Sequence, residues 1–202
     1  MIYQLMFDMN SIDDSINKGT NTIYAEKSNM DKIEYKGIKK GFFDNIILLD
    51  REFENWPEVE FYYSSRVSNI ESDLLLNIKR WPIVHKNVKA EFERSNIKGV
   101  KYFPIKLIDV VSGEINNNYF LIYVQNFIEA YDMEKSNYKY NEKYDIYTFI
   151  PNGIVMNKDI CENYDIFRCN KNKACLYVSE KIKKMVEEHN WNGFSFNLMK
   201  SE

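Results

Sequence analysis

The sequence lacks the features of secreted, membrane-spanning and disulfide-stabilised proteins. It contains no run of about 18 uncharged apolar residues, the least that suggests a membrane-spanning helix. Residues 1–8 have no basic leader, and their apolar run is far shorter than the core of a secretion signal. Its three cysteines, Cys161, Cys169 and Cys175, form an odd set in the last quarter of the chain, which argues against a disulfide framework. We therefore expect a cytoplasmic protein with reduced cysteines and no membrane contact.

The sequence also lacks the motifs of common catalytic and cofactor sites. Its seven glycines are dispersed and form neither a dinucleotide-binding turn nor a phosphate-binding loop. The two histidines, His85 and His189, both fall where we expect a helix end, and the cysteines are spaced too widely for a structural zinc site. We predict a protein without metal, cofactor or enzymatic activity. The alternative is a small cytoplasmic hydrolase or nucleotide-processing enzyme whose site is assembled from distant carboxylates.

The charge balance disfavours binding to nucleic acid. The formal net charge is −3, so the whole molecule has no attraction for a phosphate backbone. The most basic segment, residues 32–41, contains two glycines and mixed charges, which is typical of a solvated turn between strands. We expect a protein partner instead.

The composition is that of one folded domain. A chain of 202 residues with 45% hydrophobic and 15% aromatic residues is long and apolar enough to bury a sizeable core. No stretch rich in proline, glycine or serine interrupts it, so we expect residues 1–202 to form a single domain. Within it, residues 1–72 alternate short apolar runs with polar loops, which predicts a part rich in strands and loops.

The predicted fold class is α+β, with a mixed, largely antiparallel sheet and few helices. Residues 118–124 are rich in aromatic and β-branched side chains and follow a Gly/Asn-rich turn, which predicts a strand. Residues 147–150 and 154–156 flank Pro151-Asn152-Gly153, and an Asn-Gly pair favours a tight turn. These two segments are therefore predicted to form a hairpin.

The sequence repeats part of its pattern at an offset of 94 positions. The identical pairs are Val84 and Val178, Lys89 and Lys183, Glu93 and Glu187, Asn96 and Asn190, Gly99 and Gly193, and Lys106 and Lys200. Between these identities, apolar residues match apolar residues. We predict two similar strand-helix-strand units in one sheet, at about residues 82–106 and 176–200.

The second unit shows how each helix should begin and end. Ser179 is predicted to cap the helix with its hydroxyl, and Asn190 to adopt the left-handed conformation just past it. Trp191 should then pack back on Val186. Spacings of three and four residues predict one buried face, formed by Ile182, Met185, Val186 and His189. The first unit repeats this ending with Asn96, Ile97 and Phe92.

Two segments are candidates for binding another protein. Residues 131–147 are rich in tyrosine, a residue enriched at protein interfaces, and the candidate contacts are Tyr138, Tyr140 and Tyr144. Residues 50–58 combine acidic and aromatic residues that suit a basic partner, and the candidates there are Asp50, Glu52, Glu54 and Trp56. The alternatives are that the tyrosines only cover the edge of a sheet and that the acidic segment is a solvated loop.

The second half of the chain resembles a bacterial polymorphic-toxin immunity protein, of the family numbered eleven. The resemblance rests on residues 101–107, on residues 119–124 leading to residues 130–136, and on residues 165–168, 177–182 and 193–196. It covers roughly residues 73–200 and leaves residues 1–72 without a recognised relative. It implies a small cytoplasmic protein that binds and neutralises a cognate toxin encoded nearby, and it carries over no functional residues. The oligomeric state stays open.

Overall fold

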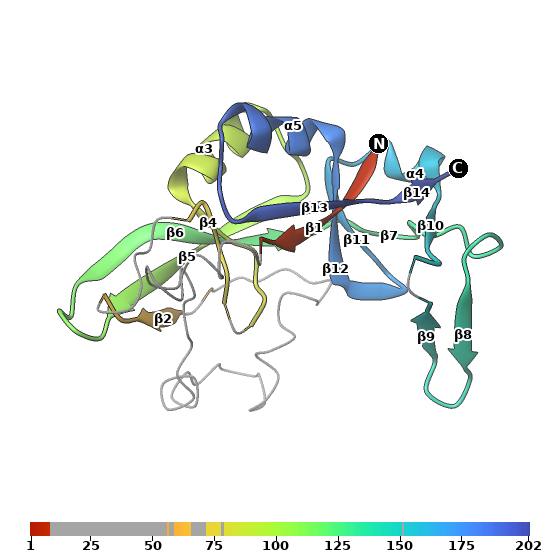
Figure 1. Cartoon of the computed structure of the whole chain (residues 1–202), viewed down its shortest axis with the longest axis horizontal. Coiled ribbons are helices and arrows are strands. Elements are labelled where there is room, and N and C mark those ends of the chain that lie inside the picture. Colours follow the sequence, from red (N-terminus) through yellow and green to blue (C-terminus); the bar gives the residue numbers. More distant parts are fainter. Residues whose placement is uncertain (9–55, 57–58, 66–71, 78, 151) are drawn as a thin grey trace.

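The protein is an α+β structure with more strand than helix (Figure 1). The computed structural model describes residues 1–8, 56, 59–65, 72–77, 79–150 and 152–202. The helices are α3 (Lys86–Arg94), α4 (Lys158–Cys161) and α5 (Glu180–Glu188). The strands are β1 (Ile2–Phe7), β2 (Glu60–Tyr63), β3 (Leu74–Leu75), β4 (Ile83–His85), β5 (Val100–Asp109), β6 (Ile115–Val124), β7 (Phe127–Ile128), β8 (Tyr138–Asn141), β9 (Ile146–Phe149), β10 (Val155–Met156), β11 (Ile166–Cys169), β12 (Asn172–Ser179), β13 (Phe194–Leu198) and β14 (Lys200–Ser201).

Most of the described strands form two five-stranded sheets. One has the order β2-β5-β6-β4-β3 and the other the order β13-β1-β12-β11-β7. Most neighbours are antiparallel, but β2 pairs with β5 in parallel and β7 pairs with β11 in parallel. The predicted fold class, α+β with a mixed and largely antiparallel arrangement, is confirmed.

Both predicted strand-helix-strand units are present, as β4-α3-β5 and as β12-α5-β13. The prediction that they share one sheet is wrong, because each unit belongs to a different five-stranded sheet. In both units the two strands do not touch each other. An antiparallel strand lies between them, β6 in the first unit and β1 in the second.

The middle strands β6 and β1 occupy equivalent positions in the two units. Strand β6 follows β5 directly, whereas β1 comes from the other end of the chain. The equivalent cross-strand pairs are His85–Tyr119 and Ser179–Ile2, and Val100–Val124 and Phe194–Phe7. The outer strands agree as well: Lys106 pairs in parallel with Glu60 of β2, and Lys200 pairs in parallel with Val155 of β10. The repeat detected in the sequence is therefore part of a larger structural repeat.

Both main helices end in the predicted way. Asn96 and Asn190 have φ angles of 55° and 52°, in the left-handed region. After α3, the N–H of Ile97 donates to the carbonyl of Phe92 at 2.9 Å. After α5, the N–H of Trp191 donates to the carbonyl of Val186 at 3.0 Å. The asparagine N–H groups donate three residues back, which completes a Schellman motif at each helix end.

The helix starts differ from the prediction. Ser179 is the N-cap residue of α5, but its hydroxyl makes no capping bond and donates instead to Asp165 at 2.8 Å. The N–H of Glu180 is satisfied by the carbonyl of Met1. In α3 the N-cap is His85, whose side chain accepts from the N–H of Asn87. At the start of α5, the carbonyl of Met1, next to β1, therefore takes the place of the Ser179 hydroxyl that the sequence suggested as the acceptor.

The predicted buried face of α5 is correct except for its last member. Ile182, Met185 and Val186 are buried, whereas His189 is the exposed C-cap residue. The imidazole of His189 stacks on Trp191 with ring centroids 4.7 Å apart, and its Nε2 lies 3.6 Å from Glu91 of α3. A histidine at this position is explained by these contacts and by the negative end of the helix dipole.

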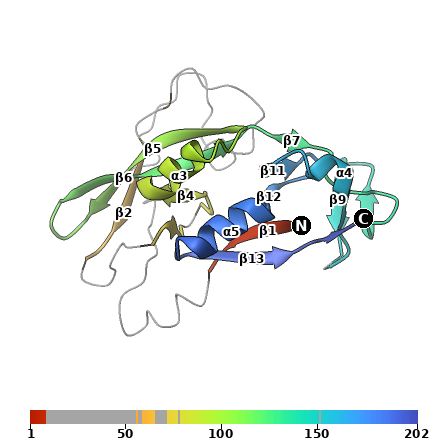
Figure 2. The ribbon, with the colours of Figure 1, turned by 90° about the horizontal axis from the view of Figure 1, so that it is seen from above.

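The two units pack on one shared core. Helices α3 and α5 lie side by side over the sheets (Figures 1 and 2), and Lys181 of α5 donates to the carbonyl of Ser95 at the end of α3. Apolar side chains of both units meet between the helices and the sheets. They include Val84, Val88, Phe92, Ile122 and Val124 from the first sheet and α3, and Tyr3, Ile166, Val178, Ile182 and Met185 from the second sheet and α5.

The predicted hairpin around Asn152-Gly153 is wrong. A turn does form there, because Asn152 is left-handed and the N–H of Gly153 donates to the carbonyl of Ile150. The strands on either side nevertheless pair with other partners, β9 with β8 and β10 with β14. A turn sequence sets the local chain direction but does not choose the strand partners.

Replacing Gly193 by alanine should destabilise the fold strongly, and Gly113 provides a matched control. Both glycines have positive φ angles, 83° and 76°, so alanine is strained at either position by about 1–2 kcal/mol. A Cβ at Gly193 would lie 2.2 Å from the carbonyl oxygen of Leu74, whereas a Cβ at Gly113 meets nothing within 4 Å. Urea denaturation should therefore show a clearly larger loss for Gly193→Ala. Equal losses of unfolding free energy for Gly193→Ala and Gly113→Ala would mean that the backbone at Leu74 moves away from the new Cβ at little cost.

Candidate protein interface on the β8–β9 hairpin

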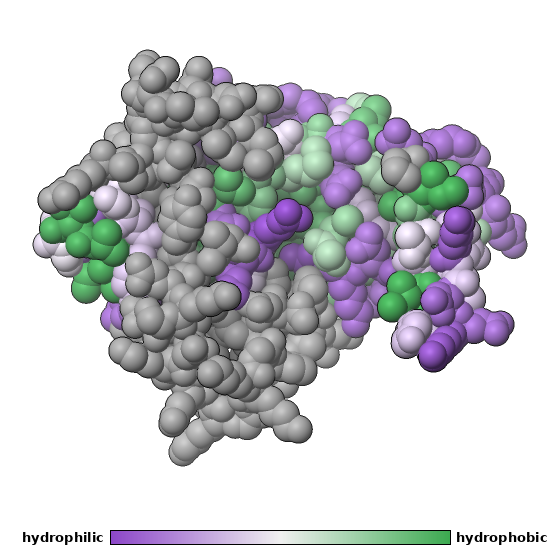
Figure 3. Space-filling view, turned by 60° about the horizontal axis from the view of Figure 1, so that its bottom comes forward, coloured by the Kyte–Doolittle hydropathy of each residue, from purple (hydrophilic) through white to green (hydrophobic). Residues whose placement is uncertain are grey.

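Strands β8 and β9 form a separate two-stranded hairpin that projects from one end of the molecule (Figures 1 and 3). The antiparallel register places Tyr138 opposite Phe149 and Tyr140 opposite Tyr147. Because side chains alternate between the two faces of a strand, these four rings share one face. The other face carries Lys139, Asn141, Ile146 and Thr148.

The aromatic face continues into the core. Ring centroids are 4.6 Å apart between Tyr140 and Tyr147 and 5.7 Å apart between Tyr138 and Phe149. Phe149 in turn packs at 4.8 Å against Tyr131, which is buried. An isolated two-stranded hairpin is marginally stable in water, so this row of rings explains how the hairpin holds its shape.

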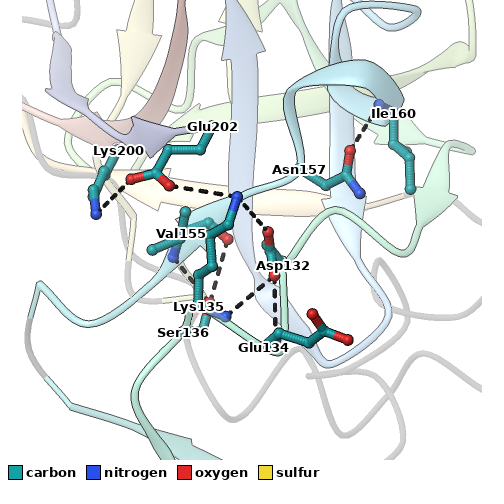
Figure 4. Close-up of polar contacts among 9 residues, drawn as sticks. All are labelled: Asp132, Glu134, Lys135, Ser136, Val155, Asn157, Ile160, Lys200 and Glu202. Carbon is teal, nitrogen blue, oxygen red and sulfur yellow. Dashed lines mark hydrogen bonds and ion pairs between the residues drawn. The ribbon is translucent and has the colours of Figure 1, made fainter.

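A network of polar contacts fixes the base of the hairpin (Figure 4). The carboxylate of Asp132 accepts the N–H groups of Glu134 and Lys135 at 3.1 and 3.2 Å. The ammonium of Lys135 bridges Asp132 and Glu202, at 3.3 and 3.4 Å. Ser136 accepts the N–H of Val155 at 2.9 Å, which ties the segment before β8 to β10.

The electrostatics of this base favour the charged forms of its carboxylates. Burial acts to raise the pKa of Asp132, but the hydrogen bonds from the backbone and side chain of Lys135 outweigh it and lower the pKa. The hydrogen bonds from Lys200 and Lys135 lower the pKa of Glu202, and those to Asp132 and Glu202 raise the pKa of Lys135. The base therefore keeps its ion pairs at neutral pH, and it orients the hairpin.

The three predicted tyrosines lie together on this hairpin but differ in exposure. Tyr138 is half-buried between the rings of Tyr147 and Phe149, whereas Tyr140 and Tyr144 are 46% and 62% exposed. Tyr140 also donates to Asp145 at 2.9 Å, which holds its ring along the hairpin. Tyr144 lies in the turn, with the ammonium of Lys143 over its ring. A partner can therefore reach Tyr140 and Tyr144 more fully than Tyr138.

Sequence reasoning missed several residues of the same surface. Ile146 and Ile150 are 53% and 42% exposed, and Ile146 lies on the face opposite Tyr138 and Tyr140, so both faces of the hairpin carry exposed apolar side chains. Lys171, from the turn between β11 and β12, places its ammonium 4.9 Å from the ring centre of Tyr147. The alternation of residues 138–149 could have indicated Ile146, but Lys171 is brought close to Tyr147 only by the fold.

The acidic candidate segment is mostly outside the described residues. Asp50, Glu52 and Glu54 lie there, and only Trp56 is placed. Trp56 is half-buried: its ring stacks on Phe103 at 4.2 Å and packs beside Trp81 in the core of the first sheet. Only the exposed part of its ring is open to a partner.

The described residues contain no cluster that resembles a metal site. No group of three or more His, Cys, Asp and Glu side chains in the placed part of the chain is arranged to hold a metal. Burial raises the pKa of the Cys161 thiol to about 12 and also raises that of Cys169, which keeps both thiols protonated and poorly nucleophilic. Burial lowers the pKa of His85, which caps α3. Among the placed helices, none has the length and apolarity to cross a membrane.

A comparison with known protein families identifies the family of the chain. Residues 4–201 match the immunity protein family Imm11. The chain belongs to this family. The match begins at residue 4, so residues 4–72, which we expected to lie outside the resemblance, are part of the family pattern. This agrees with the structure, in which β1 completes a sheet of the second unit. No curated protein matches the chain.

Tyr144→Ala should leave the stability of this Imm11 member nearly unchanged. The side chain is exposed in a turn, and such changes usually alter the free energy of unfolding by less than about 0.5 kcal/mol. Tyr131→Ala, at the foot of the same row of rings, removes a buried ring whose hydroxyl bonds Tyr177, and should cost about 3–5 kcal/mol. Denaturant melts of both variants check the contrast. A large loss for Tyr144→Ala would show that this tyrosine serves folding.

Proposed function

We propose that this protein binds and neutralises a cognate toxin, encoded nearby in the same bacterium, by association in the cytoplasm and without catalysis. Membership of an immunity family supports the class of function. The observation that carries the proposal is the β8–β9 hairpin, a firmly anchored projection whose exposed tyrosines and isoleucines have no role in the described core.

The hairpin has the physical properties of a strong protein contact. Neutralising a toxin requires a dissociation constant near nanomolar, or about −12 kcal/mol of binding free energy. Such affinity is concentrated in a few aromatic anchors, and it is greater when those anchors are already ordered before binding. The ring row and the network at the base order Tyr140 before a partner arrives, so little conformational entropy is lost on binding.

The acidic segment has a separate role in this proposal. Charges at the rim of an interface mainly speed the encounter of the partners and contribute less to the lifetime of the complex. Asp50, Glu52 and Glu54 carry three like charges within five residues, which suits a basic toxin such as a nuclease. Trp56, two positions after Glu54 in the sequence, adds a partly exposed ring.

The whole chain acts as one domain in this proposal. The two units share apolar contacts between α3 and α5, and β1 joins the beginning of the chain to its last quarter. No described feature favours the alternative of a hydrolase or nucleotide-processing enzyme. Turnover by the purified protein in a broad hydrolase screen would support that alternative.

Alanine at Tyr138, Tyr140 and Tyr144 should raise the dissociation rate of the complex at least tenfold. The three rings supply much of the apolar surface of the hairpin, and contacts of this kind mainly set how long a complex lasts. Surface plasmon resonance with the inactivated toxin domain encoded beside the chain measures this rate. The matched control is Lys139→Ala, which changes the opposite face of the same strand and should have a smaller effect.

Neutralising Asp50, Glu52 and Glu54 to asparagine and glutamine should mainly slow association. Their negative charges act at a distance and are screened by salt, so the variant should also show a weaker dependence of the association rate on salt. The same binding experiment at low and high salt measures both effects. If this variant and the tyrosine variant both fold, bind at wild-type rates and protect cells, the interface lies elsewhere.

A further inference from the structure

The exposed apolar surface of the described residues is concentrated on two hairpins. Of ten large apolar side chains with high exposure, four lie at the β8–β9 hairpin and three at the turn between β5 and β6. We call residues 109–115, where β5 ends and β6 begins, the β5–β6 tip. The two hairpins lie at opposite ends of the longest axis of the molecule (Figures 1 and 2), and apolar side chains are visible at the end formed by the tip (Figure 3, left).

A buried carboxylate holds the β5–β6 tip in one shape. Asp109 is 2% exposed and accepts the N–H groups of Val111 and Ser112 at 3.1 and 3.2 Å and the Ser112 hydroxyl at 2.7 Å. The same carboxylate accepts the N–H of Ser65, just past β2, at 3.0 Å. Burial alone would raise the pKa of Asp109, but these hydrogen bonds outweigh it and hold the pKa well below its ordinary value. The turn is therefore locked to the neighbouring strand.

The apolar residues of the tip are not needed to form this turn. Val110, Val111 and Ile115 are 55%, 42% and 50% exposed. Turns at a surface normally use Gly, Asn, Asp or Ser, and here Asp109 and Gly113 already meet that need. Three branched aliphatic side chains in water on a fixed turn are better explained by contact with another molecule.

Charge and area indicate what that molecule is. Glu114 is exposed and is the only charged residue among residues 110–118, whereas the carboxylate of Asp109 is buried and already hydrogen-bonded within the turn. The tip projects at one end of the molecule (Figure 1) and carries one exposed negative charge beside its apolar side chains, so it fits a concave site that is apolar in its centre and basic at its edge. Three side chains offer far less than the roughly 800 Å² per partner of a stable interface, so the tip alone cannot hold a second copy of the chain. A stable complex through the tip therefore needs a further contact between this protein and the same partner.

We propose that the β5–β6 tip is a second anchor of the toxin complex, inserted into an apolar, basic-edged cleft of the toxin while the β8–β9 hairpin binds elsewhere on it. This inference rests on the proposed function. Two anchors on one folded chain reinforce each other, because the second contact forms without further loss of translational freedom.

The test is a tip variant, Val110→Ser with Val111→Ser and Ile115→Thr, bound to the inactivated toxin domain encoded beside the chain. Dissociation should become at least tenfold faster, while the variant melts like the wild type because all three residues are exposed. Leu198→Ser is the matched control: Leu198 is 58% exposed on β13, away from the tip, and its replacement should leave the rate unchanged.

The outcomes separate this inference from the proposed function. If the tyrosine variant of the hairpin dissociates faster but the tip variant behaves like the wild type, the tip is not an anchor and the proposed function stands. If the wild-type protein does not bind the toxin domain, the proposed function fails and this inference fails with it. If the wild type self-associates in sedimentation experiments and the tip variant does not, the tip contacts a second copy and the inference is overturned.

Discussion

The second sheet depends on β1, which fills the place between β12 and β13. Without β1, these two strands have no common neighbour, and the N–H of Glu180 at the start of α5 loses its acceptor on Met1. In the first unit the same place is taken by β6, which needs only a short turn after β5. The second unit closes by a contact between the two ends of the chain, a longer loop whose entropy cost grows only slowly with length. The buried ring of Tyr3 then joins the core that both units share.

In the proposed function, stability and binding depend on different parts of this molecule. The repeated units bury their apolar side chains between the helices and the sheets. The β8–β9 hairpin lies between the units in the chain and belongs to neither, and its base is held by the ion pairs of Lys135 with Asp132 and Glu202. The β5–β6 tip extends beyond the repeated part and is held by Asp109. Both projections can therefore expose apolar residues without weakening the core.

The sequence predicted best what a few neighbouring residues decide. The left-handed asparagines and the hydrogen bonds after each helix depend on residues within six positions, and both copies were correct. The hydroxyl of Ser179 was assigned to a cap by the same local logic, but a distant acceptor, Asp165, takes it. The Asn-Gly turn at residues 152–153 formed, yet its flanking strands pair with β8 and β14, because strand partners are chosen by burial over the whole molecule.

By itself, the sequence determined most of the buried face of α5, the C-terminal ends of α3 and α5, the 94-residue repeat and the resemblance to an immunity family. Each of these depends on periodicity, short-range hydrogen bonding or residue order. Only the tertiary structure decided that the units occupy two sheets, that β1 completes one of them, and that Tyr140 and Tyr144 are exposed while Trp56 is half-buried against Phe103. The exposure of the apolar side chains at the β5–β6 tip was also known only from the tertiary structure. Strand order and exposure depend on contacts between residues far apart in the chain, and no local pattern records those contacts.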